Sequence, residues 1–220
     1  MTRTNRISVL FSWLLISSGA SHAADVQELV RETQRTSTTG GQVSMVWWIP
    51  VQFWEESLNS NPAIPPEARA QVLGALSDYT VIGVLRAGAG LGGLTNVIPK
   101  EELVKNLRVE IDGKVLEPLA PEKVSSTAQL LLLQMKPALG AIIGQVGQSL
   151  EFVVYPAKEN GKSLVDPTKP GNLTIAFYEE SHKWRLPLGS LLPRRKDPKT
   201  GEDFPGNYNF NPYTGGKLAR

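Results

Sequence analysis

No cysteine occurs among the 220 residues of this chain. The chain therefore forms no disulfide, and it offers no thiolate to a structural metal or to a lipid anchor. Its stability has to come from a packed hydrophobic core, which a chain of this length can build as one domain.

Histidine is almost as scarce. His22 falls in the predicted leader described below, which leaves His182 as the single imidazole of the mature chain. This scarcity excludes a histidine-based metal cluster, and the sequence alone assembles no Ser-His-Asp set. We expect His182, between Ser181 and Lys183, to be solvated.

Acidic residues occur in three adjacent pairs, and adjacency works against acid-base catalysis. Neighbours on a strand point to opposite faces, and neighbours on a helix lie about 100° apart. The pairs are Glu55–Glu56, Glu101–Glu102 and Glu179–Glu180. We therefore predict no catalytic residue and no cofactor-binding residue, which favours a protein that is not an enzyme. The alternative is a hydrolase whose carboxylates are brought together only by the fold.

Long apolar runs are also missing, and the most apolar run, near the N-terminus, is about half the roughly 20 residues that span a bilayer. Arg3 and Arg6 precede the apolar run from Ile7 to Ile16, and Ser21-His22-Ala23 follows it. This order is typical of a secretory signal. We predict that residues 1–23 are a signal peptide, cleaved before Ala24, and that the protein is exported, periplasmic or secreted.

Charge of one sign does not dominate the mature chain. Cleavage removes Arg3 and Arg6, which leaves 21 basic and 21 acidic residues. This balance argues against nucleic acid as a partner. The charge is uneven, however, because eight basic residues and only three acidic ones lie between Lys183 and Arg220. A solvated tail is the favoured interpretation, and contact with anionic lipid or an anionic polymer is the alternative.

Aromatic residues are few but concentrated. Trp47, Trp48 and Trp54 all lie in the stretch 41–58. The β-branched and aromatic run before Pro50 predicts a strand, and the proline suits the first turn of a helix that follows directly. We expect the three rings to form the core at this junction, and an exposed aromatic binding face is the alternative.

A glycine-rich segment, 88–93, matches the dinucleotide pattern G-x-G-x-x-G after an expected strand. The pattern also requires a helix to begin there, so that its N-terminus faces the pyrophosphate. Pro99 lies six residues on, and the sequence between is a poor helix. We therefore interpret the segment as a flexible loop and predict no nucleotide site.

One long helix is expected from Ser125 or Ser126 to about Val146. The run 130–133 is apolar on all sides, which predicts burial on several sides. Pro137 removes a backbone hydrogen bond and predicts a kink. Gly140 and Gly144 have the spacing that permits close approach of another backbone. A buried core helix is favoured over membrane insertion, because Lys136 interrupts the apolar run.

The remaining patterns predict a mixture of strands and helices without regular alternation. Asp112-Gly113 between alternating apolar residues is typical of a type I′ hairpin. We interpret 36–41 as a linker. Strands are expected at 43–49, 80–85, 107–111, 115–116, 150–155, 173–178 and 183–186, and helices or helical turns at 25–35, 51–58, 65–76 and 99–103. The predicted fold is α+β, with a mainly antiparallel sheet or sandwich in a globular domain, 24–190.

The last segment, 191–220, contains a short internal repeat. Asp197-Pro198-Lys199-Thr200-Gly201 returns fourteen residues later as Asn211-Pro212-Tyr213-Thr214-Gly215. The paired pattern resembles a zinc ribbon, whose two knuckles read C-P-x-C-G, with the cysteines replaced by Asp197, Thr200, Asn211 and Thr214. The rest of the chain resembles exported bacterial proteins without an assigned activity.

The replacement of the cysteines decides the expected chemistry. Zinc is bound by thiolate or imidazole, and hard cations take six to eight oxygen ligands, so we predict no metal site. We expect the turns to be held instead by backbone geometry and by packing of the nearby aromatic rings. These rings are Phe204, Tyr208, Phe210 and Tyr213. Taken together, the sequence predicts a non-enzymatic binding or structural module of the cell envelope, without a cofactor. Its partner is unassigned, and the candidates are an envelope protein, a lipid or an anionic polymer.

Overall fold

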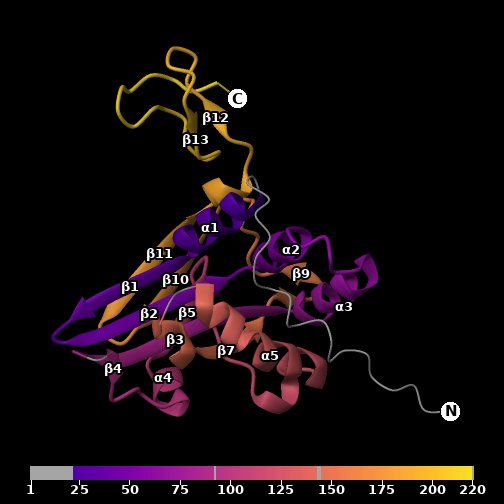
Figure 1. Cartoon of the computed structure of the whole chain (residues 1–220), viewed down its shortest axis with the longest axis vertical. Coiled ribbons are helices and arrows are strands. Elements are labelled where there is room, and N and C mark those ends of the chain that lie inside the picture. Colours follow the sequence, from indigo (N-terminus) through magenta and orange to yellow (C-terminus); the bar gives the residue numbers. More distant parts are fainter. Residues whose placement is uncertain (1–21, 92, 143–144, 220) are drawn as a thin grey trace.

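A computed structural model describes residues 22–91, 93–142 and 145–219 of the chain (Figure 1). Most of the predicted signal peptide lies outside these residues. His22 and Ala23 are described as the first residues of helix α1 (His22–Thr33), so the expected cleavage point falls in its first turn. Cleavage before Ala24 stays a prediction.

Two antiparallel sheets form the centre of the molecule. In the first sheet, β2 pairs with β1 and β3, and the other edge of β3 pairs with β7 at one end and with β4 at the other. Its strands are β1 (Gln34–Thr39), β2 (Gln42–Ile49), β3 (Tyr79–Gly90), β4 (Gly93–Thr95) and β7 (Glu151–Pro156). The second sheet has the order β11-β10-β5-β6. Its strands are β5 (Leu107–Ile111), β6 (Lys114–Leu116), β10 (Gly171–Phe177) and β11 (Glu180–Leu186).

Helices accompany both sheets, and the α+β class with mainly antiparallel sheets is confirmed. The longest is α5, which keeps Pro137 inside it. Besides α1 they are α2 (Val51–Asn59), α3 (Pro66–Leu76), α4 (Lys100–Lys105) and α5 (Ser126–Ile142), with 3-10 turns η3 (Pro121–Lys123), η4 (Gln145–Ser149) and η5 (Gly189–Leu191). Two short hairpins complete the fold, β8 (Lys158–Glu159) with β9 (Lys162–Ser163) and β12 (Arg195–Lys196) with β13 (Asp203–Phe204).

The tryptophan-rich segment lies at the centre of the core, as predicted. Trp47, Trp48 and Trp54 are at most 1% exposed. The Trp47 ring meets Phe53 of α2 edge to face at 5.2 Å, because Pro50 turns the chain directly from β2 into α2. These three rings are therefore part of the core and do not form an aromatic binding face. Each such ring removes about 150–250 Å² from water.

The predicted linker at 36–41 is wrong, because most of it belongs to strand β1. The threonine-rich segment forms a six-residue ladder with β2, from Gln34 opposite Trp47 to Thr39 opposite Gln42. Gly40 and Gly41 have φ values of 58° and 76°, the left-handed backbone that a tight hairpin turn requires. The side chains alone look like a linker, but pairing with the buried β2 makes the segment a strand.

The glycine-rich segment is a hairpin rather than a flexible loop. Strand β3 runs on to Gly90, and β4 pairs with it from Gly93. A side chain at Gly88 would lie 2.7 Å from the Thr95 hydroxyl, so the glycine permits the two strands to approach closely. No helix begins here within the described residues, which removes the structural context of a dinucleotide site.

One expectation about helix α5 also needs correction. Leu130 and Leu133 of α5 are exposed, so this helix buries one side and not all sides. Gly140 lies against Gly147 of η4, and Gly144 is outside the described residues. The strands predicted at 150–155 and 173–178 are confirmed as β7 and β10, which lie in different sheets.

The chain from Leu191 onward forms a small lobe at one end of the molecule (Figure 1). We call residues 191–219 the C-terminal lobe. It contains the hairpin of β12 and β13, and Lys196 and Phe210 form single bridges to Ala219 and Lys217. Helix α1 lies at its base, where Arg194 pairs with Glu28 at 2.6 Å.

Candidate functional site

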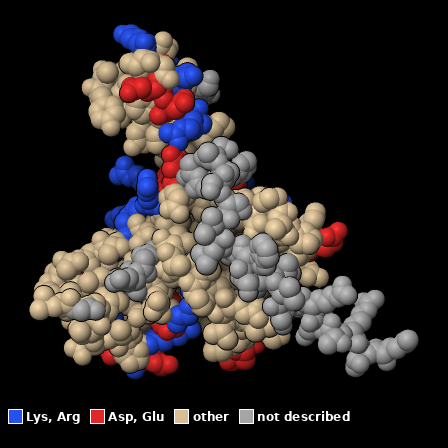
Figure 2. Space-filling view, viewed as in Figure 1, with Lys and Arg blue, Asp and Glu red and all other residues tan. Residues whose placement is uncertain are grey.

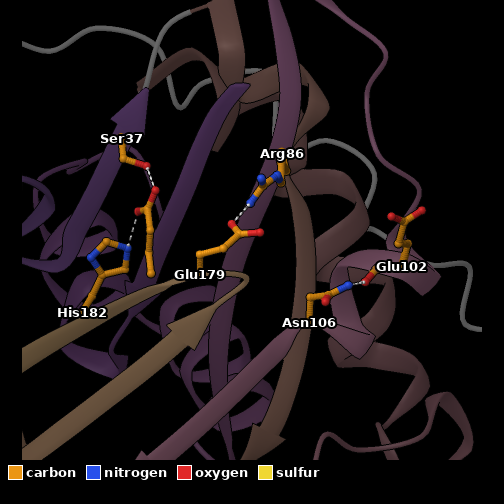
Figure 3. A network of polar contacts seen from close by, with 7 residues as sticks. Ser37, Arg86, Glu102, Asn106, Glu179 and His182 are labelled. Atoms are coloured by element: carbon orange, nitrogen blue, oxygen red, sulfur yellow. Dashed lines mark hydrogen bonds and ion pairs between the residues drawn. The ribbon is translucent and has the colours of Figure 1, made fainter. Parts of the chain in front are cut away.

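A polar cluster lies between the two sheets at one end (Figure 3). Ser37 of β1 donates a hydrogen bond of 2.5 Å from its Oγ to Glu180 Oε1. The other oxygen of Glu180 lies 3.3 Å from His182 Nε2. Glu180 and His182 pair with Phe177 and Ile175 of β10, both buried, so they lie on the inner face of the second sheet.

Two arginines of the first sheet reach aromatic rings of strand β11 and of the turn between β10 and β11. The Arg35 guanidinium lies 4.9 Å from the centre of the Trp184 ring. The Arg86 guanidinium lies 4.0 Å from the centre of the Tyr178 ring and 3.0 Å from Glu179 Oε2. Cation–π contacts and ion pairs therefore join the sheets where their side chains are polar.

The prediction that His182 is solvated is wrong, because its side chain is only 18% exposed. Burial lowers the pKa of His182 below its usual value, and the positive charge of Arg35 acts in the same direction. The negative charge of Glu180 opposes this shift. The imidazole is therefore held neutral over more of the physiological range than a solvated histidine.

The order of the groups does not fit nucleophilic catalysis. In a serine triad, the imidazole lies between the hydroxyl and the carboxylate. Here Glu180 lies between Ser37 and His182, so the histidine is not positioned to take the serine proton. The arrangement connects β1 to β11 through half-buried polar groups.

An open cavity of about 490 Å³ lies beside β10 and holds the carboxylates of Asp112 and Asp166. Both are already occupied by hydrogen bonds within the chain. Asp112 accepts from the backbone N–H of Asn172 at 2.8 Å. Hydrogen bonds from Lys169 and Thr168 lower the pKa of Asp166 to about 2. A carboxyl group with this pKa is ionised at neutral pH and is unsuited to be a general acid.

The first repeated loop of the C-terminal lobe is organised by Asp197. This buried side chain accepts, at Oδ1, hydrogen bonds from the backbone N–H groups of Lys199 at 2.7 Å and Thr200 at 3.2 Å. Gly201 N–H closes the loop on the Asp197 carbonyl at 2.8 Å, with a left-handed φ of 78°. Glycine is favoured at this position because it adopts that backbone without strain.

The second loop repeats this geometry around Asn211. Its Oδ1 accepts from the N–H groups of Tyr213 at 2.8 Å and Thr214 at 3.2 Å. Gly215 closes the loop at 2.8 Å with φ of 70°. Asn211 Nδ2 then donates to Asp197 Oδ2 at 2.6 Å, which joins the two loops. Of the four positions named in the repeat, the structure brings together Asp197 and Asn211 as direct partners.

Thr200 and Thr214 make only local contacts. The Thr200 hydroxyl donates to Glu202, and the Thr214 hydroxyl accepts from the Gly216 N–H. Within the part of the chain that the structure describes, no group of three or more His, Cys, Asp or Glu residues is arranged to hold a metal ion. The resemblance to a zinc ribbon stays a prediction.

The aromatic rings of the lobe do not all pack as expected. Phe204 is buried, but Phe210 and Tyr213 are 58% and 86% exposed, and Tyr208 is exposed as well. The lobe therefore presents three aromatic side chains to solvent. Sequence patterns missed this exposure because rings in a small segment are expected to be core.

The short ladders of the lobe place one ring and two lysines on the same side. Phe210 is bridged to Lys217, and Lys196 is paired with Asp203 on one side and bridged to Ala219 on the other. Because directly opposed residues share a face and residues alternate along a strand, Phe210, Lys217 and Lys196 lie on one face. Figure 2 shows basic side chains on the lobe and on the flank of the body beneath it. We call Lys196, Phe210 and Lys217 the cationic face; Asp203, opposite Lys196 in the hairpin, lies on the same side.

Comparison with protein-family models, with curated proteins and with solved structures gave no match. In the described ranges, no helix combines the length and the apolar character needed to cross a membrane.

Proposed function

We propose that this chain is an exported, non-enzymatic binding module of the cell envelope, and that the C-terminal lobe binds an anionic partner. One observation carries the proposal. The lobe projects from one end of the molecule and exposes Phe210 and Tyr213 next to lysines. Large exposed aromatic side chains on a small projecting segment are typical of a binding surface.

The distribution of charge supports an anionic partner. The segment 191–220 has six basic and three acidic residues, whereas 24–190 has 15 basic and 18 acidic residues. The lobe is thus positive and the body negative, and an anionic partner is attracted to the lobe and repelled by the body. Neither Lys196 nor Lys217 forms an ion pair with another described residue, so both charges are available to a ligand.

The polar cluster between the sheets supports a structural role for the remaining polar residues. Glu180 is held by Ser37 and His182, and Glu179 is held by Arg86. These contacts use the groups that an enzyme would need free for a substrate.

Binding is tested with immobilised dextran sulfate as the anionic probe, eluted with a salt gradient. The lobe variant K196Q/K199Q/K217Q should elute at clearly lower salt than the wild type, because it loses three positive charges that attract the sulfate groups. The body variant K100Q/K105Q/K123Q has the same loss of charge on exposed residues and should elute close to the wild type. Equal elution of the two variants would show that retention depends on net charge alone and would refute the assignment to the lobe.

Export is tested separately by the intact mass of the protein recovered outside the cytoplasm. We expect the mass of a chain that begins at Ala24. A chain that retains the leader would contradict this part of the proposal.

A further inference from the structure

The chemistry of the exposed residues indicates which class of anionic partner the lobe binds. The inference rests on the function proposed above. We infer that the C-terminal lobe docks on the surface of an anionic phospholipid bilayer. Phe210 and Tyr213 enter the interfacial region, and Lys196 and Lys217 lie against lipid phosphates.

Phe210 distinguishes a bilayer from a hydrophilic polymer. Its side chain has no hydrogen-bonding atom, and it is more than half exposed. Transfer of such a ring to the boundary of the acyl chains is favourable, whereas a strongly hydrated polyanion offers it no apolar environment. Tyr213, three residues on, combines an apolar ring with a polar hydroxyl, which is the combination found at membrane interfaces.

The lysines supply the second contribution to membrane binding, an electrostatic attraction to lipid phosphates. Lys217 is bridged to Phe210 across the ladder, so a ring that enters the interface brings this ammonium group to the level of the phosphates. Lys196 lies on the same face through the ladder that includes Ala219. A long lysine side chain reaches the headgroups while its methylene groups lie along apolar surface. Apolar insertion combined with basic residues is the pairing that peripheral proteins use to bind anionic membranes.

The shape and charge of the molecule fit a planar surface. The lobe lies at one end of the longest axis (Figure 1), and the body below it has the opposite net charge. An anionic surface therefore attracts the lobe and repels the body, which orients the molecule with the lobe toward the membrane. A flexible polymer requires no such separation of charge along an axis.

The experiment measures binding to sedimented vesicles of equal parts phosphatidylcholine and phosphatidylglycerol, with pure phosphatidylcholine vesicles for comparison. The full chain should bind the anionic vesicles much more tightly than the neutral ones. K196Q/K217Q should weaken binding by about thirty-fold, because each lysine near an anionic surface contributes about 1 kcal/mol. F210A/Y213A should weaken it by about ten-fold through loss of apolar insertion.

Two matched variants control for exposed residues elsewhere. L91A removes an exposed apolar side chain at the tip of the β3–β4 hairpin, and K100Q/K105Q removes two exposed lysines of α4. Both should bind as the wild type does. Thermal melting of each variant checks that the fold is retained, which is expected because all the substituted side chains are exposed.

The outcomes separate this inference from the proposed function. Retention on dextran sulfate without vesicle binding overturns the lipid inference and leaves the anionic-binding function standing. Loss of both overturns the proposed function as well. Vesicle binding that F210A/Y213A leaves unchanged overturns the insertion of the aromatic rings.

Discussion

Asn211 Nδ2 donates a hydrogen bond of 2.6 Å to Asp197 Oδ2, and this contact joins the two repeated loops of the C-terminal lobe. Both side chains are buried, and each also accepts two backbone N–H groups of its own loop. The hydrogen bond from Asn211 is the main cause that lowers the pKa of Asp197. Complementarity is required here, because one side chain must offer an acceptor where the other offers a donor.

This symmetry predicts that exchange of the two residues is tolerated, whereas single changes are not. D197N places two amide donors face to face, and N211D places two carboxylates face to face, so each should lower the melting temperature of the lobe by several degrees. The double variant D197N/N211D restores one donor and one acceptor and should recover most of the loss.

The effect of exchanging the two residues is best measured inside the lobe, for example by amide hydrogen exchange of the two loops. Additive losses in the double variant would show that the two side chains do not act as a pair. Thr200→Ala serves as a matched control, because within the described residues its hydroxyl forms hydrogen bonds only with the side chain and N–H of exposed Glu202.

The buried tryptophans predict a graded effect on stability. Replacement of Trp47, Trp48 or Trp54 by Ala should cost about 3–5 kcal/mol of unfolding free energy, measured by urea denaturation. Trp47 Nε1 donates to Thr33 Oγ1 at 3.2 Å, whereas Trp48 Nε1 has no partner among the described residues. W47F should therefore cost about 1 kcal/mol more than W48F. Equal costs would show that the Trp47 hydrogen bond makes no net contribution.

Local chemistry explains which parts of the fold could be predicted. Asp112 and Gly113 adopt φ values of 46° and 86°, so a two-residue signal determined the β5–β6 hairpin. Pro50 likewise determined the junction of β2 and α2. These residues specify a backbone conformation by themselves, and sequence patterns detect such residues well.

The polar cluster could not be predicted because its parts are distant in sequence. Ser37 and Glu180 are 143 residues apart, and they meet only because β1 and β11 lie in facing sheets. The strand that carries Ser37 was itself interpreted as a linker. By contrast, the repeat of Asp197 and Asn211 was visible, since a local pattern determines each loop and the pair forms across only 14 residues.

The half-buried histidine predicts a pH dependence of stability. Because burial lowers the pKa of His182 below its ordinary value of 6.5, the unfolded chain binds this proton more tightly than the folded chain. Unfolding free energy should therefore be highest above pH 6.5 and should fall as the pH drops below 6.5 toward the folded pKa. Glu180 and Trp184 lie beside the imidazole and Arg35 acts on it through its charge, so Glu180 is the anion among these three.

H182Q isolates this contribution, since glutamine can still donate to Glu180 but does not titrate. Unfolding by urea is measured for both proteins across this pH range. The wild type should lose more stability on acidification than H182Q. Identical pH profiles would show that His182 titrates alike in the folded and unfolded chains.

The hydrogen bonds of the C-terminal lobe also predict how the stability of the chain responds to metal ions. In the wild type, the oxygen of Asp197 that could face a metal already accepts from Asn211, so a chelator should leave the melting temperature unchanged. A ligand that binds only the folded state would raise stability by mass action, and its removal would lower the melting temperature. A chelator-sensitive wild type would show that oxygen ligands hold a metal.

If the two loops keep the shape of zinc knuckles, cysteine at the four repeat positions should create a zinc site. The variant D197C/T200C/N211C/T214C loses the hydrogen bond between the loops and should be less stable than the wild type without metal. Addition of zinc under reducing conditions should raise its melting temperature, because four thiolates at tetrahedral spacing bind zinc strongly and binding is coupled to folding. The control K196C/K199C/K217C/Y213C carries four cysteines at positions that do not correspond to the cysteines of a zinc knuckle, and it should gain no comparable stability. A repeat-position variant that ignores zinc would show that the pattern shares turns with a zinc ribbon but not its geometry.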